Sequence, residues 1–303
     1  MLALLLCAAS PLRAFENSER APLAAKTLLT AGARAGSQLV AVGDRGHVLL
    51  SSDQGRTWKQ VIVPTRALLT GVAFPDERHG WAVGHDGVIL ATQDGGQTWA
   101  RQDDGKDLNA VYLDVLFLDA QRGLVVGAYG KCKLTTDGGR TWTSTRPSKD
   151  EVHCNRITAS ADGYLYIAGE SGLLLVSRDR GETWRKANIP YEGSLFGALP
   201  LAGGKVIVHG LRGHILRSDD HGGTWSEEDN PVEVLIMGSA QIGPDAIVLG
   251  GQGGNLFVSR DQGATFKHWQ PTDFGTSIAA VLDAGDGVVL ALGEAGATRI
   301  TLP

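Results

Sequence analysis

The sequence is poor in the residues that build metal sites and nucleic-acid interfaces. Its 303 residues include 3 cysteines and 8 histidines, and no two histidines form an HxH or HxxxH pair. Because cysteines at zinc-ligand spacing are missing as well, we expect no metal site. The net charge is −5 and no run of Lys or Arg exceeds two residues, so we expect no nucleic-acid partner.

Long stretches of helical periodicity are missing too. The chain has 2 methionines and 41 glycines, and its apolar residues alternate in short runs between turns. This composition favours many short strands over helices. There is no Walker loop, and no helical pattern follows the glycine-rich turns as it would in a dinucleotide fingerprint, so we expect no cofactor.

The chain instead repeats one unit seven times. A Gly-x-x-Gly (GxxG) loop recurs every 41 to 43 residues, and the loops begin at Gly43, Gly84, Gly127, Gly169, Gly210, Gly251 and Gly293. A period of about 40 residues is typical of arrays of small sheets. We therefore predict one all-β domain over residues 15–303, a seven-bladed β-propeller of four-stranded antiparallel blades.

Six repeats carry a polar turn closed by an aromatic residue, as in TQDGGQTW at residues 92–99. The Ser or Thr hydroxyl and the Asp carboxylate can accept hydrogen bonds from nearby backbone N–H groups, and the glycine permits positive φ. We interpret these turns as folding devices. Their aspartates are Asp53, Asp94, Asp137, Asp179, Asp220 and Asp261.

Two resemblances follow from these motifs. The turn pattern S/T-x-D-x-G-x-T-W resembles the Asp-box, or bacterial neuraminidase repeat, of β-propellers. The longer stretch GWAVGHDGVILATQDGGQTW, Gly80 to Trp99, resembles the signature of the photosystem II stability and assembly factor family. This second resemblance implies an exported, non-catalytic, seven-bladed propeller that binds a membrane-protein client, a newly made reaction-centre subunit, through an arginine-rich patch.

The N-terminus has the pattern of an export signal. Leu2 to Ala9 is an apolar run too short to span a bilayer, and Leu-Arg-Ala at 12–14 approximates a small-residue cleavage site. No Lys or Arg precedes the run, which departs from a standard signal. We predict a signal peptide over residues 1–14, and hence a periplasmic protein, or a lumenal one in a photosynthetic organism.

Removal of such a signal would leave two cysteines, Cys132 and Cys154. An even count in an exported protein makes them candidates for a disulfide. The alternative is that Cys132 is a small buried hydrophobe, because it aligns with apolar residues of the other repeats such as Val48 and Ile89.

The seventh repeat ends at Pro303, before its outer strand. Residues 17–23 precede the first repeat where an outer strand should stand. We predict that this N-terminal segment pairs with the last blade and closes the ring.

In a four-stranded antiparallel blade, the second turn and the linker to the next blade lie at the same end. The GxxG loops and linkers therefore share one face, which we predict to bind a protein partner, since loops on a rigid scaffold commonly carry function. Ordinary solvated loop tips are the alternative. The candidate binding residues are Arg45, Arg66, His85, Tyr129, Arg156, Tyr191 and Arg212.

Catalysis has weaker support than binding. Sialidases carry an Arg-Ile-Pro motif near the N-terminus, and Arg156-Ile157 and Arg299-Ile300 lack the proline and the position. No position in the repeats marks a pair of catalytic carboxylates. We expect a non-enzyme that acts as a monomer, peripheral to the membrane at most. A glycan-binding or sialidase-like glycoside hydrolase propeller is the alternative.

Overall fold

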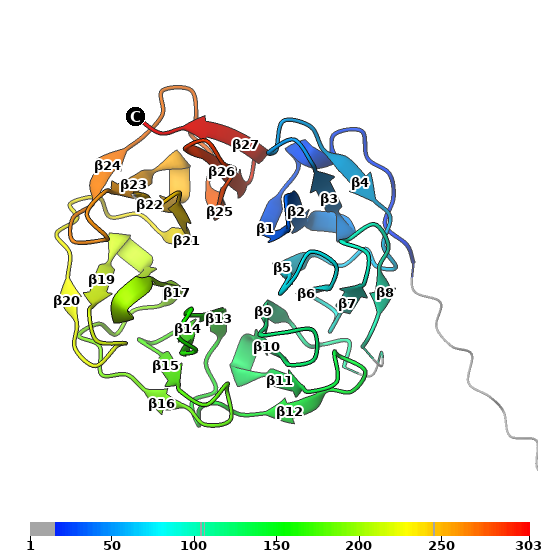
Figure 1. Ribbon diagram of the computed structural model, residues 1–303, viewed down its shortest axis with the longest axis horizontal. Helices are drawn as coiled ribbons and strands as arrows, with labels where there is room; N and C mark the ends of the chain where they lie inside the picture. Colours follow the sequence, from blue (N-terminus) through cyan, green and yellow to red (C-terminus); the bar gives the residue numbers. More distant parts are fainter. Residues whose placement is uncertain (1–15, 104, 106, 245) are drawn as a thin grey trace, which may run out of the picture.

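Seven antiparallel sheets form a ring around a central axis (Figure 1). The computed structural model describes residues 16–303 except 104, 106 and 245, so the signal peptide predicted for residues 1–14 lies outside the described residues. The all-β, seven-bladed architecture is confirmed. In the described residues the only helices are 3-10 turns of three residues, and no helix has the length and hydropathy to cross a membrane.

The strands occupy four positions in a blade, counted from the axis outward (Figure 1). The innermost strands are β1 (Leu29–Ala35), β5 (Leu69–Ala73), β9 (Tyr112–Phe117), β13 (Cys154–Ala159), β17 (Leu195–Pro200), β21 (Ile236–Ile242) and β25 (Ile278–Asp283). The second strands are β2 (Gln38–Gly43), β6 (Gly80–Gly84), β10 (Gly123–Gly127), β14 (Leu165–Gly169), β18 (Val206–Gly210), β22 (Ala246–Gly251) and β26 (Val288–Gly293).

The third strands and outer strands complete each blade. The third strands are β3 (Val48–Ser51), β7 (Ile89–Thr92), β11 (Cys132–Thr135), β15 (Leu174–Ser177), β19 (Ile215–Ser218), β23 (Leu256–Ser259) and β27 (Gly296–Thr301). The outer strands are β4 (Lys59–Val61), β8 (Ala100–Arg101), β12 (Thr143–Thr145), β16 (Arg185–Lys186), β20 (Ser226–Glu227) and β24 (Lys267–Trp269). The 3-10 turns are η1 (Ala24–Lys26), η2 (Asp44–Gly46), η3 (Ala128–Gly130), η4 (Ala202–Gly204), η5 (Leu211–Gly213) and η6 (Gln252–Gly254).

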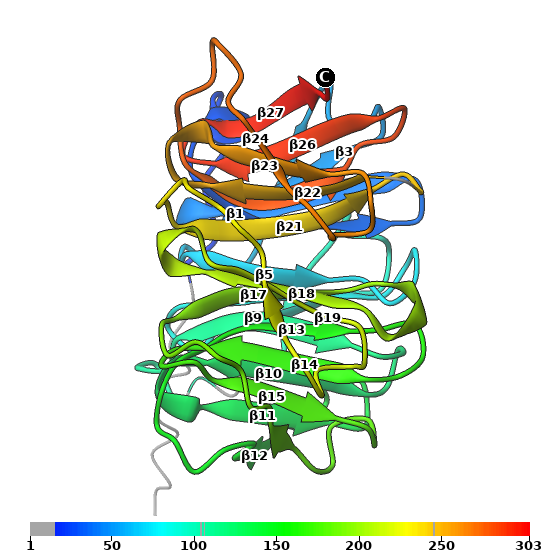
Figure 2. The same cartoon turned by 90° about the vertical axis from the view of Figure 1, so that its left-hand side faces the viewer.

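Each blade is buried on both faces because it lies between two neighbours, as the side view shows (Figure 2). In β2, Val40 and Val42 pack toward the second blade, whereas Leu39 and Ala41 pack toward the last blade. Side chains that alternate along each strand therefore point to the two faces of the sheet in turn. Both faces are apolar and packed against neighbouring blades, and neither is exposed to solvent. Burial of each such aliphatic side chain contributes about 2 kcal/mol.

The closing strand predicted from residues 17–23 is absent, so the predicted strand pairing was wrong. The N-terminal segment nevertheless reaches the last blade, because η1 packs against β27. The last sheet consists of β25, β26 and β27 only, within the part of the chain that the structure describes. The ring closes by apolar packing, in which Leu29 and Leu39 of the first blade contact Leu290 and Leu292 of the last.

The N-terminal segment lies along the outer edge of the first blade instead. The N–H of Ser18 donates to the carbonyl of Val63 at 2.8 Å, and Gln60 Nε2 donates to the carbonyl of Glu19 at 2.7 Å. Pro22 follows, and because proline has no N–H it cannot continue a strand ladder. These polar contacts and the proline direct the segment away from the position that repeat counting predicts.

The turns gather at the two ends of the ring. The GxxG loops and the inter-blade linkers form one end, the GxxG face, and the N–H of Gly87 donates to the linker carbonyl of Ala110 at 2.8 Å. The Asp-box turns and the first turn of each blade form the other end, the box face, where the N–H of Gly138 donates to the carbonyl of Gln121 at 2.8 Å. Hydrogen bonds therefore fix the loops at both ends.

Candidate functional site

Every GxxG loop is fixed to the start of its own blade. In all seven blades, the N–H of the residue after the first glycine donates to the carbonyl that precedes the innermost strand, as between Ala128 and Val111 at 2.9 Å. The third loop residue has positive φ in the six four-stranded blades, with 52° at Arg45, 56° at Tyr129 and 54° at Arg212. A second left-handed residue, the last glycine, completes a type I′ turn that suits a twisted hairpin.

Large side chains at this third position are held in a conformation that L-residues avoid. The left-handed backbone costs about 1 kcal/mol for a residue with a Cβ. In return, the turn directs the side chain to solvent: Tyr129 is 69% exposed and the Arg45 side chain 82%. The loop backbone, and not burial, sets where these side chains point.

The candidate binding residues do not form one cluster. Arg45, Arg66 and His85 lie on blades 1 and 2, and the others lie on blades 3 to 5. The guanidinium of Arg66 is already engaged within the chain, since it contacts Glu16 at 3.3 Å and Glu19 at 2.7 Å. Arg66 therefore anchors the N-terminal segment.

Arg156 differs from the sequence-based prediction because it lies within β13 and not in a linker. Its Nε is 3.8 Å from Oδ2 of Asp114, which also accepts the N–H of Ile157 at 3.0 Å. Burial raises the pKa of Asp114. Burial likewise lowers the pKa of His209, on the next blade, to about 4. Arg156 is thus part of an interior polar group rather than of the exposed face.

Repeat register could have revealed this interior group. In the other five blades, the positions of Asp114 and Arg156 hold only small residues. Those residues are Ala31, Gly71, Gly197, Gly238 and Ala280. The ring of His209 fills the space beside Gly197, where a Cβ would stand 2.4 Å from its Nε2.

Aromatic side chains of the GxxG face pair with imidazoles. Tyr129 meets the ring of His153 edge-on, with centroids 4.8 Å apart, and His153 lies 3.3 Å from the carboxylate of Glu170. Tyr191 meets the ring of His214 at a tilt of 37°, with centroids 4.3 Å apart. Ring contacts of this kind hold Tyr129 and Tyr191 in place on blades 3 to 5.

A pocket of 380 Å³ opens beside Tyr129 on blade 3. Its lining is Asp107, Tyr112, Tyr129, Gly130, Lys131, Cys132, Lys133, Ser144, Thr145 and Arg146. The one carboxylate of the lining, Asp107, pairs with Lys131 at 2.8 Å. The pocket, which we name the blade 3 pocket, therefore carries a net positive charge.

Lys133 departs from the repeat. It pairs with Val125 in β10, and the residues at the same register in the other four-stranded blades are all buried and apolar. Those residues are Leu49, Leu90, Leu175, Leu216 and Phe257. Lys133 Nζ stands 5.8 Å from the ring centroid of Tyr112, and no ion pair to Lys133 occurs within the described residues.

Sequence reasoning selected Tyr129 but missed the three basic residues of this pocket, Lys131, Lys133 and Arg146. A signal for Lys133 was available, because a lysine in the apolar run of a third strand contradicts the pattern of the other repeats. No such signal exists for Lys131 and Arg146, which stand at variable loop and outer-strand positions.

A second pocket lies at the equivalent corner of blade 5 and has a volume of 490 Å³. Its lining, the blade 5 pocket, is Arg212, Gly213, His214, Glu227, Glu228, Asp229, Asn230 and Glu233. Burial raises the pKa of Glu228. With four carboxylates against one arginine, this pocket is acidic.

Each Asp-box aspartate accepts the same set of hydrogen bonds. At Asp137, Oδ1 accepts from the Thr135 hydroxyl and from the N–H of Thr141, both at 2.9 Å, and Oδ2 accepts from the Thr141 hydroxyl at 2.7 Å. The Thr141 hydroxyl contributes most to lowering the pKa of Asp137 to about 2. The pKa is also about 2 at Asp179, Asp220 and Asp261.

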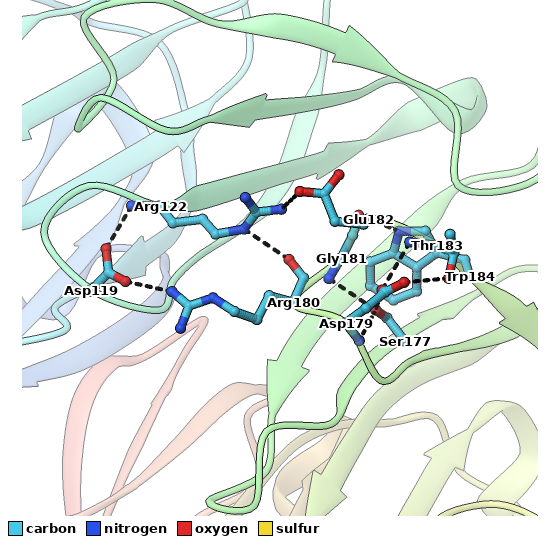
Figure 3. A network of polar contacts seen from close by, with 9 residues as sticks. All are labelled: Asp119, Arg122, Ser177, Asp179, Arg180, Gly181, Glu182, Thr183 and Trp184. Atoms are coloured by element: carbon cyan, nitrogen blue, oxygen red, sulfur yellow. Dashed lines mark hydrogen bonds and ion pairs between the residues drawn. The ribbon is translucent and has the colours of Figure 1, made fainter.

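Contacts between blades occupy the box face. Figure 3 shows the box of blade 4, where Arg180 donates to Asp119 of blade 3 at 2.5 Å. Arg122 of blade 3 donates to the carbonyl of Arg180 at 3.0 Å and pairs with Glu182 at 2.6 Å. These bonds engage the polar groups of this face in joining neighbouring blades.

The described residues include two cysteines, and none of their acidic groups forms a metal site. Cys132 and Cys154 are buried free thiols that share one apolar cluster between blades 3 and 4. No group of three or more His, Cys, Asp or Glu side chains in the described residues could hold a metal ion.

Curated relatives match this chain in short segments. A photosystem II stability/assembly factor HCF136 of Cyanidioschyzon merolae is 45% identical over 53 residues, 17% of this chain and 12% of the relative. A photosystem II assembly protein Ycf48 of Thermosynechococcus vestitus is 43% identical over 42 residues, 14% and 12% of the two chains. The matches thus span about an eighth of these relatives' own length.

Solved structures share the whole fold. YCF48 bound to D1 peptide superposes with a TM-score of 0.75 at 21% identity, covering 92% of this chain and 94% of the other. YCF48 from Cyanidioschyzon merolae gives 0.74 at 17% identity, covering 91% and 96%. The sequence profile of the photosynthesis system II assembly factor YCF48 family matches residues 50–110 and 104–233, more than half of the chain. The chain therefore belongs to that family.

Proposed function

We propose that this chain is a non-catalytic, exported propeller that binds a membrane-protein client through its GxxG face and assists the assembly of a membrane complex. It acts as a monomer in the periplasm, or in the thylakoid lumen of a photosynthetic organism, and is peripheral to the membrane. Family membership supports the class of function, since the relatives are named as photosystem II assembly factors. A structural neighbour solved with D1 peptide supports a client of this kind.

The observation that carries the proposal on this chain is Lys133. A lysine at a position that buries leucine or phenylalanine in five other blades gives up apolar burial worth about 2 kcal/mol. Natural proteins break such local rules mainly at functional sites. We infer that Lys133 is kept for what it binds in the blade 3 pocket.

The charge and shape of this pocket favour an acidic segment of the client. The lining holds Lys131, Lys133 and Arg146 against one carboxylate, Asp107. Lys131 pairs with Asp107 at 2.8 Å, and Arg146 pairs with Glu151, outside the lining, at 3.1 Å. Tyr129 stands exposed at the rim, and tyrosine and arginine are the side chains that most often dominate binding energy at interfaces. An acidic peptide could pair with Lys133 while an apolar group packs on Tyr129.

The same lining argues against hydrolysis of glycosides at this site. That reaction uses two carboxylates on opposite sides of the scissile bond. The blade 3 pocket has one carboxylate, Asp107, and Lys131 pairs with it. We therefore assign binding and not catalysis to this pocket.

The test is photo-crosslinked capture from native membranes with the tagged chain, followed by mass spectrometry. The decisive variant is Lys133→Leu, which restores the residue of the repeat and so preserves the fold. Arg140→Ala is the matched control, because it removes a positive charge from the box face of the same blade. We expect the unaltered chain and Arg140→Ala to recover the same membrane protein.

With Lys133→Leu we expect recovery to fall at least tenfold, as it should when a charged anchor is removed. We also expect its melting temperature to equal or exceed that of the unaltered chain. Equal recovery by Lys133→Leu and Arg140→Ala would refute binding at the blade 3 pocket. Recovery of no membrane protein by any of the three would refute the proposed function.

A further inference from the structure

One apolar contact recurs at the interfaces between blades. The first residue of a third strand packs in the same cluster as the first residue of the next innermost strand. Five interfaces show the pairs Val48 with Leu69, Ile89 with Tyr112, Leu174 with Leu195, Ile215 with Ile236, and Leu256 with Ile278. At the interface of blades 3 and 4, both members are cysteine, Cys132 and Cys154.

Packing alone does not account for this pair. The other five interfaces fill the two positions with larger hydrophobic side chains, so cysteine at both leaves less apolar surface buried. Cys132 and Cys154 are also the only cysteines of residues 16–303. The two cysteines lie on different blades and occupy the two positions of one interface pair. This placement points to a property that needs two sulfur atoms.

The two thiols are buried together. Cys132 is 4% exposed and Cys154 is 2% exposed, in one cluster with Leu173 and Leu175. The neighbouring Cys154 thiol and burial both raise the pKa of Cys132, which makes this thiol slow to oxidise unaided.

The two cysteines differ in their distance from a surface pocket. Cys132 belongs to the lining of the blade 3 pocket, whereas Cys154 does not. Lys131 and Lys133 line the same pocket.

We infer that Cys132 and Cys154 form a disulfide that joins blades 3 and 4 in an oxidising compartment. The oxidant is the disulfide of a thiol–disulfide exchange partner. The Cys132 thiolate attacks it, forms a mixed disulfide and releases one thiol of the partner; Cys154 then attacks the Cys132 sulfur and releases the second. The two cysteine protons and two electrons end on the partner, which leaves as a dithiol. This inference does not depend on the proposed client.

The test uses the full chain recovered from an oxidising compartment, with oxidised glutathione as the probe. Peptide mapping without reduction should find the peptides of Cys132 and Cys154 linked, which also separates them from Cys7. Reduction should lower the melting temperature by about 5 °C, because the cross-link closes a loop of about 20 residues in the unfolded chain.

Three variants test the mechanism. The double variant Cys132→Val with Cys154→Val restores an apolar pair, and its melting temperature should not respond to reductant. Cys154→Ala should trap glutathione on Cys132, whereas Cys132→Val should leave Cys154 unmodified while folded. Separate, alkylatable cysteines after full oxidation would overturn the cross-link. Preferential glutathione labelling of Cys154 would overturn the route through the pocket.

Discussion

Blades 3 and 5 present pockets at the same corner of the GxxG face, and the two pockets have opposite charge. Two basic residues of blade 3, Lys131 and Arg146, correspond in the repeat to His214 and Asp229 of blade 5. The strands and Asp-boxes below the pockets are built alike. A conserved scaffold within one chain can therefore carry opposite surfaces, because the loop and outer-strand side chains are free of packing constraints.

The third strands of the two blades differ in a way that is harder to accommodate than the differences between their loops. Leu216 in blade 5 is fully buried, as the repeat predicts, whereas Lys133 occupies the same register in blade 3. At this register of the third strand, blade 5 therefore keeps the apolar residue of the repeat and blade 3 does not. This difference is the reason to place the client on blade 3.

The strongest way to break the comparison is to change the charge of each pocket in turn. Lys133→Glu removes the net positive charge of the blade 3 pocket, and we expect client binding to weaken about hundredfold, since a like charge replaces a pairing one. Asp229→Arg gives blade 5 an arginine at the position of Arg146, and binding should stay within twofold. Equal losses in the two variants, measured by surface plasmon resonance, would place the client across both pockets.

Substitution of Tyr129 and of Arg212 should affect client binding differently, and the effect should be smaller than that of Lys133→Glu. The two residues occupy the same left-handed position of their turns. Glycine at either site removes the cost of a left-handed backbone, so neither Tyr129→Gly nor Arg212→Gly should lower the melting temperature. Binding should weaken about tenfold for Tyr129→Gly alone, as for loss of an aromatic anchor. A tenfold loss for Arg212→Gly as well would extend the interface to blade 5.

Acid should weaken the scaffold of both blades together. Hydrogen bonds lower the folded pKa of Asp137 and Asp220 to about 2 from an ordinary value of 3.8. A depressed folded pKa adds stability above the unfolded pKa, and this stability is lost as pH falls through the folded pKa. Urea unfolding should therefore show a decline from about pH 4 to about pH 2; a flat profile would contradict a structural role for the boxes.

The smallest expected effect compares single boxes. Asp137→Ala in blade 3 and Asp220→Ala in blade 5 each remove equivalent hydrogen bonds. We expect each to lower the melting temperature by about 2–4 °C, and by the same amount in both blades. A much larger loss in one blade, measured by calorimetry, would show that the two scaffolds are not equivalent.

Repeat counting predicted the number of blades, the strand order and the face on which the loops lie. It did so because each blade is built from contacts within about 40 residues, and turn residues such as Gly55 and Asp53 act locally. It failed at the closing strand, where Ser18 and Pro22 direct the N-terminal segment to the first blade. That choice depends on partners far along the chain, which a repeat pattern does not encode.

The candidate site was predicted less completely than the fold. Tyr129 and Arg212 were selected from the variable loop positions, whereas Arg156 lies within β13 and pairs with buried Asp114. Loop residues can be assigned to a face from strand count alone. The neighbouring outer strand decides which of these loop residues line a pocket. The length of the outer strand and the residue at which it ends vary between blades.

The sequence by itself determined the unit, the number of its copies and the hydrogen bonds of each turn, because these depend on residue type at fixed short spacing. Only the tertiary structure decided how the ring closes, that Lys133 and Arg146 meet Tyr129 in one pocket, and that Cys132 contacts Cys154. Each of these depends on side chains of different strands or blades meeting in space. Such contacts form when the sheets pack, and no local pattern specifies them.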